Sequence, residues 1–364
     1  MALKVAIVGL PNVGKSTLFN ALTQTASAQA ANYPFCTIEP NTGDVAVPEP
    51  RLEQLAKVAG SKDIIPSRIN FVDIAGLVRG ASKGEGLGNQ FLANIRDCDA
   101  VAFVARCFED GDITHVEGRI DPIADLEIIE TELMLADLES LEKRVPNLEK
   151  RARQDKDSAD TLRLVKVALE QLNAGRPARA AQISKDDYKA WHMLQLLTSL
   201  PALYVCNVDE ASADKGNAFS DLVAERAKRD NAKSVVISAQ IESEIALLDP
   251  AERAEFLETL GLHEPGLNRL IREAYALLGL QSYFTVGPKE ARAWTIEVGT
   301  TAPQAAGVIH NDFEKGFIRA ETIAFDDFIK LGGENGAKEA GKMRSEGKEY
   351  IVKDGDVMHF RFNV

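Results

Sequence analysis

An eight-residue loop near the start, Gly9-Leu10-Pro11-Asn12-Val13-Gly14-Lys15-Ser16, limits the folds open to this chain more than any other segment. It follows an apolar, β-branched run at residues 3–8 and precedes a stretch with helical spacing at residues 16–22. In a strand–loop–helix of this kind, glycines let backbone N–H groups turn inward around phosphates, and the helix N-terminus favours negative charge. The pattern predicts a phosphate-binding α/β domain.

The loop and its continuation supply a full set of phosphate contacts. Lys15 is expected to reach the β and γ phosphates of a bound nucleotide, and the Ser16 hydroxyl to ligate Mg²⁺. The backbone of the loop would complete the cradle. The predicted nucleotide-binding residues here are Asn12, Val13, Gly14, Lys15, Ser16 and Thr17. A glycine turn beside a surface lysine is the alternative, which the flanking strand and helix disfavour.

Two further segments come in the order that nucleotide hydrolases use. Asp73-Ile74-Ala75-Gly76 fits D-x-x-G, in which the carboxylate holds Mg²⁺ through water and the glycine amide faces the γ-phosphate. Thr37 lies between the loop and this segment, where its hydroxyl could complete the Mg²⁺ shell and sense the γ-phosphate. The predicted metal ligands are therefore Ser16, Thr37 and Asp73. A lone threonine is more often structural, so this role depends on the other motifs.

The rest of the chain divides into regions with different patterns of apolar residues. Further strand-like runs occupy residues 68–74, 100–105, 201–207 and 234–238, with helical patterns between them, which predicts a parallel sheet with helices on both faces. Apolar spacing over residues 124–144 and 158–173 predicts an antiparallel helical hairpin inserted between two strands. After residue 280, short apolar runs separated by Gly, Pro and Asp predict a small α+β domain, with a hairpin turn at Asp354-Gly355.

Composition excludes several classes of protein. The formal charge of −13 argues against nonspecific nucleic-acid binding by the whole surface, although residues 143–179 carry ten Lys/Arg against five Asp/Glu. The four cysteines form no CxxC pair, so neither a disulfide framework nor a zinc site is indicated. No apolar run approaches the ~20 residues of a membrane helix, and the N-terminus lacks signal-peptide features. We therefore expect a cytoplasmic protein.

The motifs together resemble the Obg branch of the translation-factor GTPases. The matching segments are Gly9–Ser16, Tyr33–Asn41, Asp73–Val78 and Gly84–Leu92; with Asp112–Gly118 they are closely similar to the YchF/Obg-like ATPase subfamily. The resemblance implies a P-loop G domain in two parts, a helical insertion and a C-terminal TGS domain, a ubiquitin-like β-grasp module. The expected boundaries are 1–135 and 199–280 for the G domain, 136–198 for the insertion and 281–364 for the TGS domain.

The segment after the fourth strand bears on which base is bound. GTP-binding relatives use N-K-x-D, whereas this chain has Asn207-Val208-Asp209-Glu210. Asp209 is one place too early to contact guanine, and Glu210 has an extra methylene, so a misplaced partner would cost ~1–3 kcal/mol. This argument predicts loss of guanine recognition; preference for adenine comes only from the resemblance. Ser238 and Ala239 resemble the later loop whose backbone flanks the base. Without these motifs, Asn207 and Glu210 would read as a plain helix-start turn.

Hydrolysis needs a group that orients water, and the residue after D-x-x-G is Leu77, which has no donor or acceptor. The resemblance favours His115 as this group, beside Lys15 as the other catalytic residue. A surface histidine is an equally weighted alternative for His115. Arg79 and Arg106 are weaker candidates for charge stabilisation.

Two further inferences concern cations and oxidation. In similar loops, an asparagine at the position of Asn12 favours K⁺ as an auxiliary cation. Cys36, beside Thr37, is either a redox-sensitive residue of the metal site or a small apolar filler.

Three functions compete at this point. The resemblance implies a slow ATPase switch that acts in translation or in the stress and redox response. Its expected partner is the ribosome, as the large subunit and as the whole particle, contacted through the helical insertion and the TGS domain. No membrane or DNA partner is expected. An ordinary Obg-type GTPase and a non-enzymatic scaffold stabilised by nucleotide are the alternatives, and the basic stretch at 143–179 is either RNA-facing or a solvated helical face.

Overall fold

The computed structural model describes residues 3–30, 41–74, 87–110 and 119–363. The chain forms two compact units, and each consists of two separate segments. The first unit comprises Met1–Val45 and Asn70–Ala274, and the second comprises Ala46–Ile69 and Tyr275–Val364. The chain therefore leaves the first unit after its second strand, contributes to the other unit, and returns.

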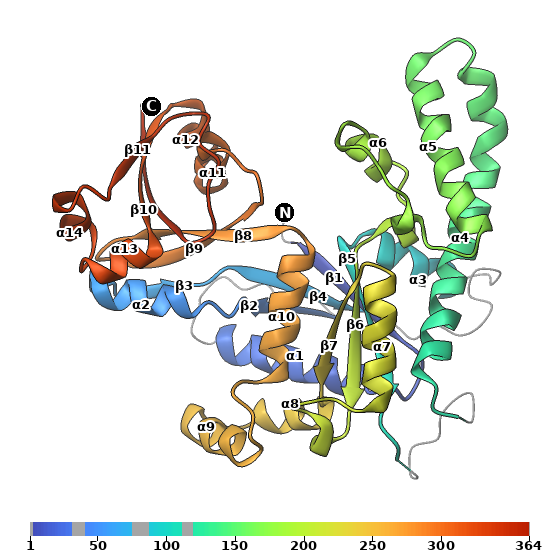
Figure 1. The fold of residues 1–364 in the computed structure, drawn as a ribbon, viewed down its shortest axis with the longest axis horizontal. Helices are drawn as coiled ribbons and strands as arrows, with labels where there is room; N and C mark the ends of the chain where they lie inside the picture. Colours follow the sequence, from blue (N-terminus) through green and yellow to red (C-terminus); the bar gives the residue numbers. More distant parts are fainter. Residues whose placement is uncertain (1–2, 31–40, 75–86, 111–118, 364) are drawn as a thin grey trace. The chain divides into compact units, whose positions relative to one another are not determined.

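The first unit is built on a six-stranded sheet with the order β2-β4-β1-β5-β6-β7 (Figure 1). Its strands are β1 (Lys4–Gly9), β2 (Thr42–Ala46), β4 (Arg68–Asp73), β5 (Ala100–Cys107), β6 (Ala202–Val208) and β7 (Lys233–Ile237). The pairs β4-β1, β1-β5, β5-β6 and β6-β7 are all parallel. All eight residues of β5 and all seven of β6 are buried, as continuous apolar strands inside a parallel sheet must be. The five predicted strands and the α/β class are confirmed.

Helices flank this sheet, and several carry the caps that the sequence offers. They are α1 (Lys15–Ala30), α3 (Leu87–Arg96), α7 (Ala218–Arg229), α8 (Ala239–Ile245), α9 (Pro250–Thr259) and α10 (Gly266–Leu277), with the short 3-10 turn η4 (Glu210–Ser212) after β6. Asn217 forms a capping box with Ser220 at α7, and Asp249 does so with Glu252 at α9. Because caps satisfy the free N–H groups of a first turn, these helices begin where the sequence places Asn or Asp.

The predicted helical insertion is an antiparallel arm made of α4 (Pro122–Arg151) and α5 (Lys156–Asn173). Figure 1 shows α4 starting beside the sheet and continuing past it, with α5 packed along its outer part. Leu141, Leu164, Val165 and Ala168 form the arm's apolar core with Trp191. The chain then returns to β6 through short turns: η1 (Ala178–Ala180), η2 (Lys185–Asp187), α6 (Tyr188–His192) and η3 (Leu197–Ser199).

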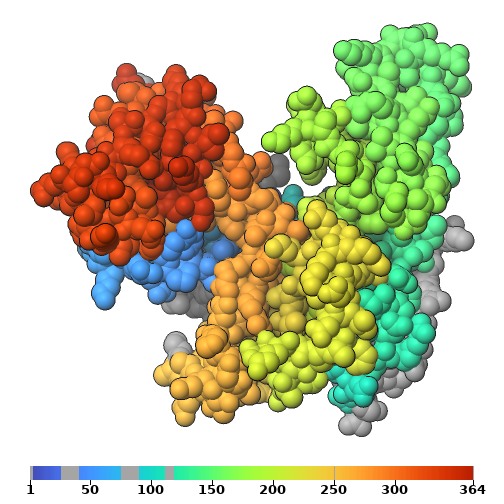
Figure 2. Space-filling view, in the orientation of Figure 1, coloured from blue at the N-terminus to red at the C-terminus, as the bar shows by residue number. Residues whose placement is uncertain are grey.

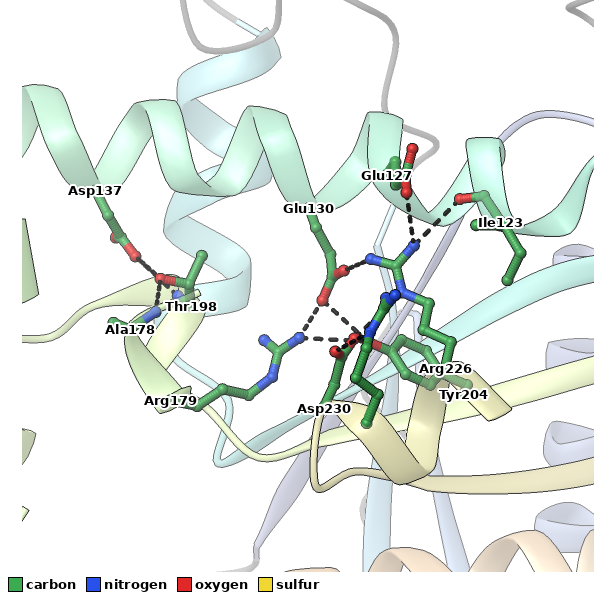
Figure 3. A network of polar contacts seen from close by, with 11 residues as sticks. Ile123, Glu127, Glu130, Asp137, Ala178, Arg179, Thr198, Tyr204, Arg226 and Asp230 are labelled. Carbon is green, nitrogen blue, oxygen red and sulfur yellow. Dashed lines mark hydrogen bonds and ion pairs between the residues drawn. The ribbon is translucent and has the colours of Figure 1, made fainter. Parts of the chain in front are cut away.

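A buried polar network joins the base of the arm to the sheet (Figure 3). Glu130 of α4 accepts hydrogen bonds from the guanidinium groups of Arg179 and Arg226 and, at 3.2 Å, from the Tyr204 hydroxyl of β6. Asp230 also pairs with Arg226, at 3.3 Å. About two turns farther along α4, Asp137 accepts from the backbone N–H groups of Leu197 and Thr198. Charges buried in this way need partners, and here they come from four elements of the first unit.

The second unit has its own six-stranded sheet, with the order β11-β10-β12-β8-β9-β3. Its strands are β3 (Asp63–Ile65), β8 (Leu280–Val286), β9 (Glu290–Glu297), β10 (Phe317–Ala324), β11 (Arg344–Glu346) and β12 (Asp356–Phe362). Its helices are α2 (Pro50–Ala59), α11 (Ala302–Ile309), α12 (Asn311–Lys315), α13 (Phe325–Lys330) and α14 (Glu334–Glu339). One apolar core lies around Tyr283, Ile296, Phe317 and Phe360, and the other around Phe284 and Phe328.

The segment 46–69 packs with this second unit, although the sequence boundaries placed it in the first part of the G domain. Leu52 and Leu55 of α2 are buried in the core around Phe284, and β3 pairs in parallel with β9. Arg51 bonds Glu49 and, at 2.8 Å, Asp354 of the C-terminal segment. Apart from Glu49, these partners lie more than 200 residues away in sequence, so no local pattern marks the boundary.

The predicted hairpin at Asp354-Gly355 is wrong in its pairing. A turn is present, and Gly355 has the left-handed φ of +87° that favours glycine. However, β12 pairs with β10 and β8, whereas Ile351 bridges Thr301. The Asp354 carboxylate accepts from Arg51 and from the backbone N–H of Ser282, so this turn connects different parts of the unit instead of two adjacent strands.

Candidate functional site

The loop from Gly9 to Ser16 has the geometry that its glycines predict. It connects the end of β1 to the start of α1, at the carboxyl edge of the first sheet. A side chain at Gly9 would meet Val13 at 2.9 Å and the Val104 carbonyl at 3.0 Å. Gly14 has a φ of +90°, and a Cβ there would lie 2.1 Å from the Asn207 amide nitrogen. Both glycines are therefore required by close approach, and Gly14 also by its backbone conformation.

A cation and a carboxylate meet beside this loop. The Lys15 ammonium donates a hydrogen bond to Oδ1 of Asp73, which ends β4, next to β1 in the sheet. The Lys15 side chain is about one-tenth exposed and that of Asp73 about one-fifth. Ser16, the next residue of α1, is exposed. The sheet therefore brings together Lys15 and Asp73, which the sequence placed in one site although they are 58 positions apart.

The donor set suits a hard cation. A hydroxyl and a carboxylate are ligands that Mg²⁺ takes in nucleotide sites, where water and phosphate oxygens complete the shell. Among the described residues, there is no group of three or more His, Cys, Asp or Glu side chains that could hold a metal ion. Ser16 and Asp73 therefore fit a metal whose coordination is completed by water and phosphate oxygens.

Asn207, at the end of β6, connects the phosphate loop to the start of α8. Its side-chain amide donates to the Val13 carbonyl at 2.9 Å, and its oxygen accepts from the backbone N–H of Ala239 at 2.9 Å. The residue is 4% exposed. Ser238 is the N-cap of α8, where its hydroxyl accepts from the N–H of Ile241. Asn207, Ser238 and Ala239 are thus brought together with the loop, and Asn207 fixes the position of both neighbouring segments.

The three residues after Asn207 differ in their exposure to solvent. Val208 is buried, whereas Asp209 and Glu210 are exposed. Asp209 caps η4, since its carboxylate accepts from the N–H of Ser212 at 3.0 Å. Asp209, which stands one place before the position that reads guanine in N-K-x-D, is thus engaged in starting a helical turn.

These residues surround a cavity of about 1040 Å³, which is large enough for a nucleotide. It is lined by Leu10, Pro11, Asn12, Gly14, Lys15, Ser16, Thr17, Phe108, Glu109, Asp110, Asn207, Val208, Asp209, Glu210, Ala211, Ala239 and Gln240. Sequence reasoning missed the wall formed by residues 108–110. The available signal was its position directly after β5, because the carboxyl ends of parallel strands meet at one edge of a sheet.

Arg106, a weaker candidate for charge stabilisation in the sequence, is buried next to the cavity wall. It is 1% exposed, and its guanidinium donates to the carbonyls of Phe108 and Asp110, both at 3.2 Å. These bonds direct the side chain to the residues that follow its own strand. Of the other predicted site residues, Thr37, Gly76 and His115 lie outside the described residues, as do Cys36, Leu77 and Arg79.

Comparison with known proteins shows the family. A model described as "50S ribosome-binding GTPase" matches residues 4–137, and a YchF GTPase C-terminal model, described as a protein of unknown function, matches residues 280–363. Proteins named "Ribosome-binding ATPase YchF" are 58% identical in Haemophilus influenzae, 56% in Escherichia coli and 53% in Bacillus subtilis. Each match covers the whole of both chains. The chain belongs to the YchF family.

Solved structures agree with this assignment. The Schizosaccharomyces pombe YchF GTPase is 36% identical, with a TM-score of 0.88 over 99% of this chain and 97% of that one. A GTP-binding protein from Pyrococcus horikoshii, at 18% identity and a TM-score of 0.61, shares the fold over 99% of this chain and all of that one. The printed names of YchF proteins thus include both ATPase and GTPase. Across the part of this YchF chain that the structure describes, no helix has the length and apolar character to cross a membrane.

Proposed function

We propose that this YchF protein is a ribosome-binding ATPase that works as a nucleotide-dependent switch in translation or in the stress and redox response. The observation that carries the proposal is the cavity at the sheet edge, which is lined by the phosphate loop with Lys15 and by Asn207. Lys15 pairs with Asp73, and Asn207 bonds the loop. Full-length relatives at 53–58% identity bear the name ribosome-binding ATPase. Because the proposed partner is the ribosome, the cytoplasm is the location that we propose.

Residues of the cavity are assigned to the nucleotide by their chemistry. Backbone N–H groups from Asn12 to Thr17, at the start of α1, would bind the phosphates, and Lys15 would leave Asp73 to neutralise them. Ser16 and Asp73 would hold Mg²⁺, with Thr37 and Gly76 completing the shell and the γ-phosphate contact. When bound, the metal supplies positive charge to the phosphate oxygens. His115 would orient the attacking water, and Asn12 would favour K⁺ as a second cation.

ATP is proposed to bind in preference to GTP. Guanine recognition needs a carboxylate in one place that accepts two hydrogen bonds, and the three residues that follow Asn207 offer none suited to it. Asp209 is engaged as a helix cap, Glu210 is longer and exposed, and Val208 has no polar group. A guanine N–H left without a partner would cost roughly 1–3 kcal/mol, enough to remove a preference of ~10–100-fold.

Competition binding on the purified chain tests this proposal. Increasing ATP should displace a fluorescent adenine nucleotide at concentrations at least ~10-fold below those that GTP requires. Lys15→Ala should abolish both binding and hydrolysis of ATP, since it removes the ammonium from the phosphate site. A clear preference for GTP would favour the ordinary GTPase reading. Tight ATP binding with no turnover, alone or with ribosomes, would favour the nucleotide-stabilised scaffold.

The ribosome contact is proposed to lie at the end of the helical arm and on the C-terminal unit, on the large subunit and the whole particle. Several cations of the 143–179 stretch are engaged elsewhere: Lys143 with Glu139, Arg163 with Asp187, and Arg179 with Glu130. The exposed cations Lys150, Arg151, Arg153 and Lys156 surround the turn between α4 and α5. Figure 2 shows the arm in green as a projecting ridge. Cations on a projecting turn can reach RNA phosphates.

Charge reversal tests the arm contact. A variant with Lys150, Arg151 and Arg153 all changed to Glu should lose most of its co-sedimentation with 50S subunits and whole ribosomes, and wild-type binding should weaken as salt rises. The matched control changes Lys228, Arg229 and Lys233, three exposed cations of the same unit, to Glu. Equal loss in both variants would indicate a net-charge effect, and no loss in either would exclude the arm.

A further inference from the structure

Arg106 stands out as the largest side chain that is fully buried in the part of the chain that the structure describes. It lies one residue before the end of β5, at the same edge of the sheet as the phosphate loop. A guanidinium keeps its charge in a protein, so burying it is costly unless its donors are used. We therefore expect Arg106 to form hydrogen bonds at this edge that an apolar side chain could not form.

Two hydrogen-bond partners of Arg106 belong to the residues that follow it. Its Nε donates to the Phe108 carbonyl and its Nη2 to the Asp110 carbonyl, both at 3.2 Å. Its guanidinium also lies over the Phe108 ring, with 4.6 Å between Cζ and the ring centroid. A planar fork that binds two carbonyls and covers an aromatic ring fixes both the backbone and the side chain of this short segment.

The fixed segment is a wall of the nucleotide cavity. Phe108, Glu109 and Asp110 line the cavity together with the residues that follow β6. Arg106 and Asn207 are partners in the register of β5 and β6, so two buried polar side chains stand next to each other at this edge. Asn207 holds the phosphate loop and the start of α8, whereas Arg106 holds residues 108–110.

We propose that Arg106 is a positioning residue for nucleotide binding, which holds the Phe108–Asp110 wall against the nucleoside part of the ligand. The inference rests on the proposed function, in that it takes the cavity to bind ATP. Arg106 is assigned no phosphate contact, because its Nε and Nη2 donate to carbonyls of the segment that follows its strand. Its removal should therefore weaken contacts to the nucleoside and leave the phosphate cradle intact.

Two probes separate these contributions: ATP with Mg²⁺, and inorganic tripolyphosphate with Mg²⁺, which has no nucleoside. Arg106→Met, which removes the fork and keeps most of the apolar stem, should raise the Kd for ATP about 10-fold or more. Its Kd for tripolyphosphate should stay within about twofold of wild type. Arg106→Lys, which keeps the charge but lacks the fork, should recover only part of the ATP affinity. In hydrolysis, KM for ATP should rise more than kcat falls.

Controls make the outcome decisive. Lys15→Ala should lose both probes, and Arg144→Met, which removes an arginine–carbonyl bond in the arm, should lose neither. Phe108→Ala should weaken ATP binding as Arg106→Met does, and the double variant should lose little more than either single one, because both act through one wall. Unchanged ATP affinity in Arg106→Met, or equal loss of both probes, would overturn the inference. Failure of the wild-type chain to bind ATP would instead overturn the proposed function.

Discussion

At the scale of single residues, the site depends on close contacts between positions that are far apart in the sequence. The side-chain amide of Asn207 occupies the space that a Cβ on Gly14 would fill, and its two polar atoms bond Val13 and Ala239. One buried side chain thus holds the phosphate loop and the α8 segment at a fixed separation. The width of the cavity depends on this residue as much as on the loop itself.

Asn207→Ala should weaken ATP binding by about 100-fold. The substitution leaves the Val13 carbonyl and the Ala239 N–H buried without partners, which costs roughly 1–3 kcal/mol for each group. Titration calorimetry with ATP and Mg²⁺ measures the effect. Asp155→Ala, which removes the N-cap of α5 in the arm, is the control and should leave affinity unchanged. Wild-type affinity in Asn207→Ala would show that the loop keeps its shape without the two hydrogen bonds of the Asn207 side chain.

Local sequence pattern was enough to group Lys15 with Asp73, and the structure brings these two side chains together. Lys15 and Ser16 are singled out by the spacing of two glycines and Asp73 by its place at the end of a strand, and their roles toward a nucleotide remain predictions. Arg106 and Phe108 could not be assigned in the same way, because nothing in their local sequence tells a buried arginine that holds its own loop from a free one. That distinction appears only in the folded chain, where Arg106 is buried and donates to the carbonyls of Phe108 and Asp110.

At the scale of elements, one buried carboxylate connects two helices of the first unit. Glu242 of α8 is 2% exposed and accepts from the N–H groups of Gly266, at 2.7 Å, and Leu267, at 3.2 Å, at the start of α10. Burial raises the pKa of Glu242 to about 7, against the smaller lowering effects of these N–H groups and of Arg269 and Arg253. Unlike an ordinary surface glutamate, Glu242 titrates near neutral pH.

This raised pKa predicts a fall in stability between about pH 4.5 and pH 7. In that range the unfolded chain has released the Glu242 proton whereas the folded chain still holds it, so the free energy of unfolding decreases as the pH rises. The expected loss is about 3 kcal/mol, complete above the folded pKa. Glu242→Gln, which cannot ionise, should lack this part of the pH dependence. Urea unfolding at several pH values compares the two proteins, and parallel curves would contradict the assignment.

The base of the arm gives the second prediction at this scale. Glu130→Ala should destabilise the first unit by roughly 3–5 kcal/mol, because it leaves Arg179 and Arg226 buried with less opposing charge. Figure 3 shows that these groups come from α4, the return of the arm and α7. Thermal unfolding and limited trypsin cleavage measure the change. Glu139→Ala, which breaks an exposed pair with Lys143 on the same helix, should have no measurable effect. If the two variants had the same melting temperature, the Glu130 network would not contribute the predicted stability.

At the scale of the whole molecule, a segment that lies between two parts of the first unit in sequence packs with the second unit. The sequence predicted the small C-terminal α+β domain from its texture, but not that α2 and β3 belong to it. Leu52, Leu55 and Ala56 have ordinary helical spacing, which shows that one face is buried but not against what. Their partners, such as Phe284 and Phe328, lie over 200 residues later. Such a segment can be assigned to a unit only from its long-range contacts, and the local spacing of apolar residues does not reveal them.

Leu55→Ala in the full-length chain tests this arrangement. Leu55 is fully buried in the core around Phe284, so the truncation should destabilise the second unit by about 2–5 kcal/mol. Hydrogen exchange should show lost protection in β8, β9 and β12, although the substitution lies between two strands of the first sheet in sequence. Strands β1, β5 and β6 should keep their protection. Leu222→Ala, at an exposed leucine of α7, is the matched control. The strands that lose protection identify the core to which α2 belongs. If Leu55→Ala instead lowered the protection of β1 and β5, residues 46–69 would belong to the first unit.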